Sequence, residues 1–203
     1  MLFYNSPNPA PNPRRVRIFA AEKGIALPTR DLSIPDREHK SDEFLALNPR
    51  GQTPALQLDD GTVIAESVAI CRYLEGMHPE PPLFGRDPRE QALVEMWSRR
   101  VEMILMPPVG AVWVHTHPFT ARLPGRNDEW GEANRPRADE AMRFFDTALQ
   151  GREFIATDEY TVADILLLTT VDFAGFIGIA MSDDLTSLRA WHARASARPS
   201  AAA

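Results

Sequence analysis

Residues Asn48–Glu75 read NPRGQTPALQLDDGTVIAESVAICRYLE, and this stretch decides the predicted fold. Pro54 opens a short apolar run, and the bond before it is a candidate cis peptide because X-Pro bonds carry only a small trans preference. Asp59-Asp60-Gly61 is a hairpin signal that predicts strands over residues 55–58 and 62–64. Apolar residues then recur at helical spacing, which predicts a helix that starts at Glu66-Ser67.

The same stretch has the features of a site for a peptide-like ligand. A cis bend would leave the backbone N–H and C=O of Thr53 free to pair with an extended ligand as a short added strand. Ser67 at a helix start offers a hydroxyl beside free backbone N–H groups, which suits a ligand carboxylate. The sequence therefore predicts a binding site in this stretch as well as a fold.

Upstream, the chain carries His39-Lys40-Ser41, Phe44-Leu45 and Asn48-Pro49 at a matching distance. With these residues the stretch resembles the glutathione site of the cytosolic glutathione S-transferases. The run PNPRRVRIF at residues 11–19 is similar to a bacterial and fungal branch of that family. The resemblance covers nearly the whole chain, although the second half matches more by pattern than by motif.

The N-terminal part is predicted to alternate strands and helices. A strand is expected over residues 2–4, then a helix over residues 14–23 with Asn12 as its cap and Pro13 at its first position. A second strand over residues 25–32 and a short helix near residues 43–47 complete the order. The resemblance implies an α/β, thioredoxin-like, glutathione-binding domain at residues 1–77.

The C-terminal part is predicted to be helical. A proline-rich connection at residues 76–87 is typical of a domain boundary, so an all-helical domain is expected at residues 87–203. A long helix should start at Asp87-Pro88 and bend at Pro107-Pro108. Further helices are predicted over residues 132–150, after a capping box at residues 161–164, and over residues 184–196, followed by a frayed alanine-rich tail.

Composition narrows the function classes. The 203 residues include 44% hydrophobic residues, as in ordinary globular proteins, and the net charge of −6 argues against nucleic acid as the main partner. The single cysteine fits a reducing cytoplasm, and no apolar run is long enough to span a membrane. Cys71 shares a helical face with Ile70, so a buried core thiol is expected.

The resemblance implies a set of glutathione-binding residues: His39, Lys40, Gln52, Thr53, Pro54, Glu66 and Ser67. The Glu66-Ser67 pair would hold the γ-glutamyl end of glutathione. Thr53 would pair with the cysteinyl backbone, assisted by Gln52. The His39-Lys40 pair would face the glycyl carboxylate, where a cation helps.

The group that activates the glutathione thiol is not given by the motif. Family members usually place a Tyr, Ser or Cys near the first helix, but here the serine position is Ala10. One candidate is Asn12, at the positive end of the first helix. The other is a water held by His115 or His117, as some family members without the hydroxyl are thought to use. These two histidines lack further ligands at metal-site spacing, so no metal is expected.

The resemblance implies attack of the glutathione thiolate on a hydrophobic electrophile, with a homodimer as the assembly. Three residues are candidates for the pocket of the apolar co-substrate: Met106, Trp113 and Phe119. Two alternatives remain open: a related protein that binds glutathione or a partner with little catalysis, and a glutathione-dependent peroxidase or reductase.

Overall fold

A computed structural model describes all 203 residues, which form two compact units. Unit 1 consists of Met1–Leu83 together with Pro199–Ala203, and unit 2 of Phe84–Arg198. The sequence placed the boundary in the connection at residues 76–87 and assigned the C-terminal residues to the second domain. In the structure, the chain returns to unit 1 at its C-terminus.

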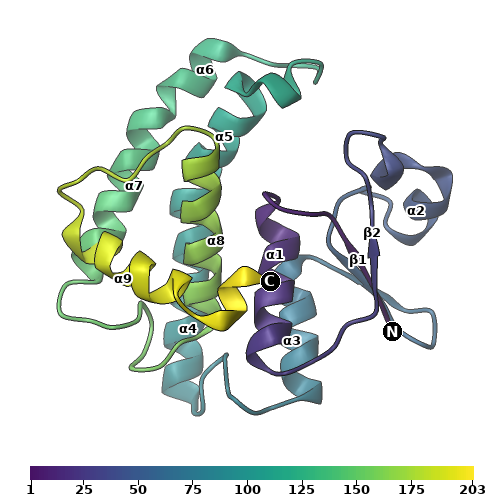
Figure 1. Cartoon of the computed structure of the whole chain (residues 1–203), viewed down its shortest axis with the longest axis horizontal. Coiled ribbons are helices and arrows are strands. Elements are labelled where there is room, and N and C mark those ends of the chain that lie inside the picture. Colours follow the sequence, from purple (N-terminus) through teal and green to yellow (C-terminus); the bar gives the residue numbers. More distant parts are fainter. The chain divides into compact units, whose positions relative to one another are not determined.

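Unit 1 is built on a four-stranded mixed sheet with the order β2-β1-β3-β4. Its strands are β1 (Leu2–Asn5), β2 (Thr29–Asp31), β3 (Ala55–Gln57) and β4 (Val63–Ala65). Figure 1 labels two of these strands, β1 and β2, which lie side by side. β1 pairs in parallel with β2, whereas β3 is antiparallel to both of its neighbours. The predicted hairpin around Gly61 is confirmed as the β3–β4 connection, and the bond between Thr53 and Pro54 is cis.

Helices cover both faces of this sheet. They are α1 (Pro11–Glu22), α2 (Asp42–Leu47) and α3 (Ser67–Met77). On the α2 face, Tyr4 and Ala55 pack with Phe44, and the Tyr4 and Phe44 ring centroids lie 5.5 Å apart. Because side chains alternate along a strand, the paired Phe3 and Leu56 point to the opposite face, where α1 packs beside α3. Both residues are fully buried there.

Two predicted boundaries in unit 1 are wrong. Helix α1 starts at Pro11, with Ala10 as its cap, so Asn12 lies inside the first turn and is not the cap residue. The strand predicted over residues 25–32 is reduced to Thr29–Asp31, because Ile25 N–H bonds back to Ala20 O at 2.9 Å and the chain is still closing the helix end.

The alanine-rich tail, predicted to be frayed, instead forms a short 3-10 helix at Pro199–Ala202. This segment packs against α1. Arg14 donates to the carbonyl of Ala201 at 2.9 Å, and the Ser200 hydroxyl bonds the Glu22 carboxylate. Alanine content alone gives no sign of these polar contacts, and for this reason the prediction of a frayed tail was wrong.

Unit 2 consists of helices, as predicted. They are α4 (Pro88–Arg100), α5 (Met106–Thr116), α6 (Asp128–Ala133), α7 (Arg135–Ala148), α8 (Val162–Phe176) and α9 (Thr186–Ser196). Helix α8 is the most buried of them and contacts α4, α5 and α9. The helix predicted over residues 132–150 is divided in two at Asn134, because Pro136 in the first turn of α7 cannot continue the preceding helix.

The predicted bend at Pro107-Pro108 takes a different form. The irregular segment is a π-helical turn, Val101–Leu105, just before the prolines, which occupy the first turn of α5. Proline lacks an N–H and its ring clashes with the carbonyl four residues earlier, so the distortion falls on the preceding turn. No helix in either unit is both long and apolar enough to cross a membrane.

The predicted capping box at the start of α8 is confirmed. The fully buried Asp164 carboxylate accepts hydrogen bonds from Thr161 N at 3.0 Å, Ile155 N at 3.0 Å and Trp191 Nε1 at 2.9 Å. Burial raises the pKa of Asp164, and these donors act against that shift. One carboxylate thereby connects the start of α8 to the preceding loop and to α9.

Candidate functional site

One pocket in unit 1 brings together most of the residues that the sequence predicted for a binding site. Its volume is about 220 Å³, and it is lined by Asn12, Ile34, Asn48, Gln52, Thr53, Pro54, Ala65, Glu66 and Ser67. These residues come from the first turn of α1, the loop after β2, the loop before β3 and the connection from β4 to α3. Segments far apart in the sequence thus converge on one polar pocket.

The loop before β3 is held in place by hydrogen bonds to its own backbone. Asn48, which is 5% exposed, donates from Nδ2 to the carbonyl of Gln52 at 2.8 Å. Lys40 donates from Nζ to the carbonyls of Arg50 and Gly51 at 2.9 and 2.7 Å. Gly51 has a φ of +55°, and a Cβ there would lie 2.7 Å from the carbonyl oxygen of His39. The loop geometry therefore requires glycine at this position.

The start of α3 combines a strained residue with a buried hydroxyl. Glu66 has a φ of +69°, which is uncommon for a residue with a side chain and is found where surrounding structure enforces it. Ser67 follows at the first position of α3 and is 5% exposed. The Arg15 guanidinium lies 3.4 Å from the Ser67 hydroxyl, so a positive charge supports this corner of the pocket. Such a corner is suited to a carboxylate.

The first turn of α1 contributes one backbone donor to the pocket. Residues 11 and 13 are prolines and have no N–H, whereas the N–H groups of a first turn have no partner within the helix. Asn12 is therefore the only residue of this turn with a free backbone N–H. Its N–H lies at the positive end of the helix dipole, and no hydroxyl side chain accompanies it.

The His39-Lys40 pair does not line the pocket. The Lys40 ammonium lies on the loop carbonyls, and the Nδ1 atom of His39 is buried without a hydrogen-bond partner. Partial burial, and then the charges of Lys40 and Arg37, lower the pKa of His39. His39 is consequently a neutral side chain at pH 7.

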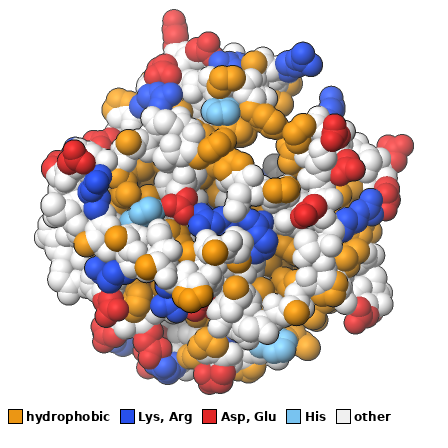
Figure 2. Space-filling model, in the orientation of Figure 1, with side chains coloured by type: hydrophobic (Ala, Val, Ile, Leu, Met, Phe, Trp, Pro, Cys, Tyr) orange, Lys and Arg blue, Asp and Glu red, His pale blue; other side chains and the backbone are white.

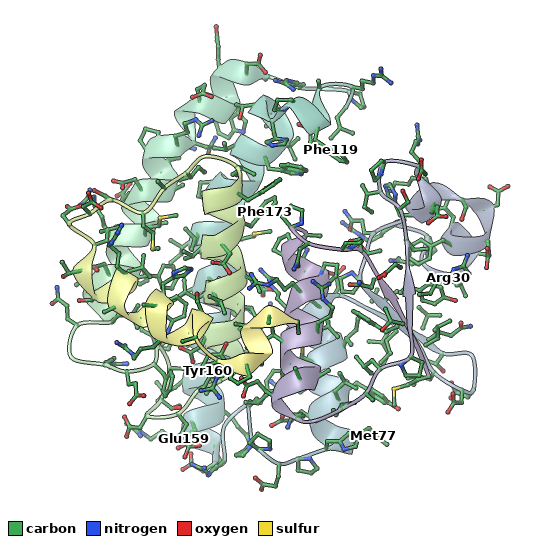
Figure 3. All side chains as sticks on the ribbon, in the orientation of Figure 1. Arg30, Met77, Phe119, Glu159, Tyr160 and Phe173 are labelled. Atoms are coloured by element: carbon green, nitrogen blue, oxygen red, sulfur yellow. The ribbon has the colours of Figure 1, made fainter.

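In unit 2, two of the three residues predicted for an apolar co-substrate lie in one aromatic surface. Trp113 is its centre, with ring centroids 5.7 Å from Phe119, 5.3 Å from Phe173 and 4.4 Å from His117. Phe176 lies 6.4 Å from Trp113. Figure 3 shows Phe119 and Phe173 on the same side of unit 2, reaching from the segment after α5 and from α8. We call these five residues the aromatic surface.

Much of the aromatic surface is open to solvent. Phe119 and Phe176 are 54% and 50% exposed, whereas Phe173 is only 6% exposed. Figure 2 shows how apolar side chains are interspersed with charged ones over the visible face of the molecule. Met106, the third predicted residue, is half-buried in the first turn of α5 and has no ring contact with the aromatic surface.

The two candidate histidines face different neighbours. His117 belongs to the aromatic surface and stacks near Trp113. His115 packs against α6, because a Cβ at Gly131 would lie 2.9 Å from the His115 Cβ atom. The structure therefore does not bring the two rings together on one site.

The single cysteine lies in the core. Cys71 is fully buried, and burial raises the pKa of its thiol, as expected for a core residue. No group of three or more His, Cys, Asp or Glu side chains is arranged to hold a metal ion.

Comparisons with known proteins agree with this arrangement. Residues 10–77 match the N-terminal domain of glutathione S-transferases and residues 106–199 match the C-terminal domain. Glutathione S-transferase 2 of Saccharomyces cerevisiae is 37% identical over 204 aligned residues, which cover 98% of this chain and 87% of that protein.

Solved structures give the same result. The crystal structure of Gtt2 from Saccharomyces cerevisiae superposes with a TM-score of 0.92 at 36% identity, covering 98% of both chains. A glutathione S-transferase domain-containing protein of Marinobacter aquaeolei gives 0.91 at 37% identity, with 98% and 99% covered. The two units are thus the thioredoxin-like and helical parts of a glutathione-transferase fold. The chain belongs to the glutathione S-transferase family, and it is an enzyme of that class.

Sequence reasoning missed several residues of these two regions. Asn48 was considered only as part of the motif, although its side-chain amide fixes the loop of the pocket by a hydrogen bond. Arg15, beside Ser67, was not among the predicted site residues, yet it is buried. Phe173 and Phe176 lie three residues apart near the end of α8. That helical spacing was the available signal for an aromatic face.

Proposed function

We propose that this chain binds glutathione in the pocket of unit 1 and stabilises its thiolate there. The thiolate then attacks a hydrophobic electrophile, for which the aromatic surface is the proposed binding face. The observation that carries the proposal is the convergence of Asn12, Thr53, Glu66 and Ser67 on one polar pocket. The family uses glutathione as a substrate, and this pocket offers Glu66 and Ser67 to its γ-glutamyl end.

The γ-glutamyl end is assigned to Glu66 and Ser67. Its carboxylate would accept from the Ser67 hydroxyl at the N-terminus of α3, supported by the nearby Arg15 charge. The amine would pair with the Glu66 carboxylate. A positive φ is unfavourable for a residue with a side chain, and a role in glutathione binding would explain why Glu66 has this conformation.

The remaining parts of glutathione are assigned to the loop before β3 and its neighbours. Thr53, next to Pro54, would pair through its backbone with the cysteinyl residue, and Gln52 would assist. The glycyl carboxylate is assigned to the His39-Lys40 pair. Because His39 is neutral at pH 7, the Lys40 ammonium would supply the positive charge there.

Thiol activation is assigned first to Asn12. A thiolate near the first turn of α1 would accept from the one free backbone N–H and benefit from the helix dipole. The Asn12 side-chain amide is a second donor in the same position. A water held by His115 or His117 remains the alternative source of activation.

The test is an ultraviolet titration of the thiolate of bound glutathione against pH. A bound-thiol pKa well below that of free glutathione is expected for the wild type. Asn12→Ala keeps the backbone N–H and should raise that pKa only slightly, whereas Asn12→Pro removes it and should raise it further. Circular dichroism checks that α1 is intact in both variants.

The outcomes separate the candidate functions. Binding without a lowered thiol pKa would favour a glutathione-binding interaction protein with little catalysis. A lowered pKa with turnover of peroxides or disulfides, but not of electrophiles, would favour a peroxidase or reductase. Absence of glutathione binding would refute the pocket assignment. Conjugation of hydrophobic electrophiles fits a detoxification role in the cytoplasm, where glutathione is abundant.

We also propose that the chain forms a homodimer through an apolar groove of unit 2. The groove has a volume of about 670 Å³ and includes Met103 and Trp130, which are 73% and 47% exposed. Arg137 and Glu140 border it without an ion pair, whereas Arg143 in the same helix is paired. Two opposite charges one helical turn apart can pair with their counterparts in a two-fold related copy.

Sedimentation of Met103→Glu tests this interface. The wild type should sediment as a dimer and the variant as a monomer, because a charge in the apolar groove disfavours burial. Leu123→Glu, at another exposed apolar position, should stay dimeric. A monomeric wild type would refute the dimer, and a dimeric Met103→Glu would refute this groove as its interface.

A further inference from the structure

Arg17 directs all of its hydrogen bonds to one short segment of unit 1. This segment, residues 5–8, runs from the end of β1 towards the first turn of α1. The Arg17 guanidinium donates from Nη1 to Asn5 Oδ1 at 2.5 Å and to the Ser6 carbonyl at 3.2 Å. Its Nη2 atom donates to Asn8 Oδ1. A side chain of α1 therefore fixes the segment that leads into α1.

Two further hydrogen bonds attach the same segment to its neighbours. Asn5 donates from Nδ2 to the Asp31 carboxylate of β2 at 2.5 Å, which leaves its Oδ1 atom for Arg17. The Ser6 and Thr53 hydroxyl oxygens lie 2.8 Å apart, so the segment is also bonded to the loop before β3. Asn5 and Ser6 are only 5% and 1% exposed. The segment is thus held from α1, from β2 and from the loop of the pocket.

This network supports the pocket without lining it. Asn12 and Thr53 line the pocket, whereas Arg17 and the residues that it contacts do not. The Ser6 hydroxyl is bonded to Thr53 and almost fully buried, so it is not offered to a ligand. Arg17 can therefore act on glutathione only through the groups that it holds in place.

The position of the segment matters because the donor assigned to the thiol is a backbone group. Ala10 has no hydroxyl, and the N–H of Asn12 is the free backbone donor of the first turn. A side chain can change its rotamer to reach a ligand, whereas a backbone N–H points where the chain places it. Donors stabilise negative charge best when their geometry is set in advance. Fixing the chain that precedes Asn12 therefore fixes the donor.

We propose that Arg17 is a positioning residue for thiol activation. By holding residues 5–8, it sets the place of the first turn of α1 relative to Thr53, which is assigned to the cysteinyl backbone of glutathione. The thiol donor and the backbone contact of the same cysteinyl group are then aligned by one hydrogen-bonded network. This inference rests on the proposed function, because it names a residue that supports the same thiol site.

Three substitutions weaken the network outside the pocket. Arg17→Gln removes the guanidinium and its charge. Arg17→Lys keeps the positive charge, but a single ammonium lacks the planar fork that donates from two nitrogens. Asn8→Ala removes one acceptor at an exposed position, so it tests the network without disturbing the buried part of unit 1.

Arg14→Gln is the matched control for charge. Arg14 lies in the same helix and donates to the carbonyl of Ala201 at 2.9 Å. Burial, and then the charge of Arg14, lower the pKa of Arg17, so the two positive charges are near each other. Arg14→Gln therefore removes a neighbouring charge and leaves the hydrogen bonds of Arg17 in place.

The readout is the ultraviolet titration of the thiolate of bound glutathione, on variants whose fold is checked by circular dichroism. Both Arg17 variants should raise the bound-thiol pKa by about one pH unit, and Asn8→Ala by about half as much. Arg14→Gln should leave the bound-thiol pKa unchanged. Glutathione affinity, measured by calorimetry at a pH below the bound-thiol pKa, should stay within about threefold of the wild type in all four variants.

A wild-type thiol pKa in both Arg17 variants would overturn the inference. A rise in Arg17→Gln that Arg17→Lys does not share, or an equal rise in Arg14→Gln, would show that charge and not position matters, and would also overturn it. If neither Arg17 variant folds, Asn8→Ala decides: a raised pKa supports the inference and a wild-type value overturns it.

These outcomes leave the proposed function intact as long as the wild type lowers the thiol pKa. A wild type that binds glutathione without lowering its thiol pKa would instead refute thiolate stabilisation in the pocket. The inference would then fail together with the proposed function.

Discussion

The pocket of unit 1 and the aromatic surface of unit 2 are built on different principles. The pocket depends on backbone: a cis Thr53–Pro54 bond, a positive φ at Glu66, and one free N–H in the first turn of α1. The aromatic surface depends on side chains from α5, α8 and the segment between α5 and α6. A backbone-built pocket suits a constant co-substrate, whereas a side-chain-built surface can change with the electrophile.

The largest effect is expected from a substitution that disrupts the helix packing that supports the aromatic surface and leaves the pocket of unit 1 unchanged. Asp164→Ala leaves the buried N–H groups of Thr161, Ile155 and Trp191 without their acceptor. We expect a loss of roughly 3–5 kcal/mol in the free energy of unfolding, since a buried hydrogen-bond network is broken. Urea unfolding followed by tryptophan fluorescence measures it, because all four tryptophans lie in unit 2.

The control for this change is Asp158→Ala, at an exposed position, which should stay within about 0.5 kcal/mol of the wild type. Below its unfolding transition, Asp164→Ala should still bind glutathione with wild-type affinity. A loss below about 1 kcal/mol would contradict the assigned importance of this carboxylate.

The second effect concerns the pocket. Ser67→Ala removes the hydroxyl assigned to the γ-glutamyl carboxylate, and we expect about a tenfold loss of glutathione affinity. Isothermal titration calorimetry measures it, with Ser187→Ala in unit 2 as the control. The tryptophan-detected unfolding of unit 2 should be unchanged. Unaltered affinity would show that Ser67 does not hold the ligand.

Local chemistry explains why much of the pocket was predictable. The cis Pro54, the hairpin at Gly61 and the helix that starts at Ser67 each depend on a few neighbouring residues, and the structure has all three. The start of α1 was predicted wrongly because Pro11 and Pro13 are equally acceptable in a first helical turn. Short-range patterns cannot rank such equivalent alternatives.

The aromatic surface was predicted only in part for the opposite reason. Trp113 and Phe119 are near in sequence, but Phe173 and Phe176 join them only through the packing of α8 against α5. The different neighbours of His115 and His117 also depend on tertiary contacts, since His115 packs against α6 and accepts a hydrogen bond from the backbone N–H of Asn127. Such information is not present in local spacing.

A smaller effect should distinguish the aromatic surface from other exposed apolar side chains. Phe176→Ala removes a half-exposed ring, and we expect KM for an aromatic electrophile to rise about threefold to tenfold because one stacking contact is lost. Steady-state kinetics at saturating glutathione measure it. Leu123→Ala, similarly exposed in unit 2, should leave KM unchanged. Equal effects of both variants would argue against a specific surface.

The smallest effect is expected at an ion pair outside both regions. Arg143 Nη1 lies 2.5 Å from the Asp184 carboxylate and lowers the pKa of Asp184 to about 2. A carboxyl group whose pKa is lowered by folding stabilises the folded state at any pH above the ordinary carboxyl pKa. This contribution is lost as the pH falls through about 2. The Tm of Asp184→Asn should therefore be slightly below that of the wild type at pH 5, and the two should converge near pH 2.

Asp183→Asn is the matched control for this last change, because Asp183 is fully exposed and its contact with Arg189 is longer, at 3.2 Å. It should not alter the pH dependence of Tm. Neither substitution should affect glutathione affinity or the KM of the electrophile, since both regions are held by their own contacts. A changed electrophile KM in Asp184→Asn would mean that the aromatic surface depends on how α7 is tied to the start of α9. The contrast between a pocket built from backbone and a surface built from its own side chains would then be wrong.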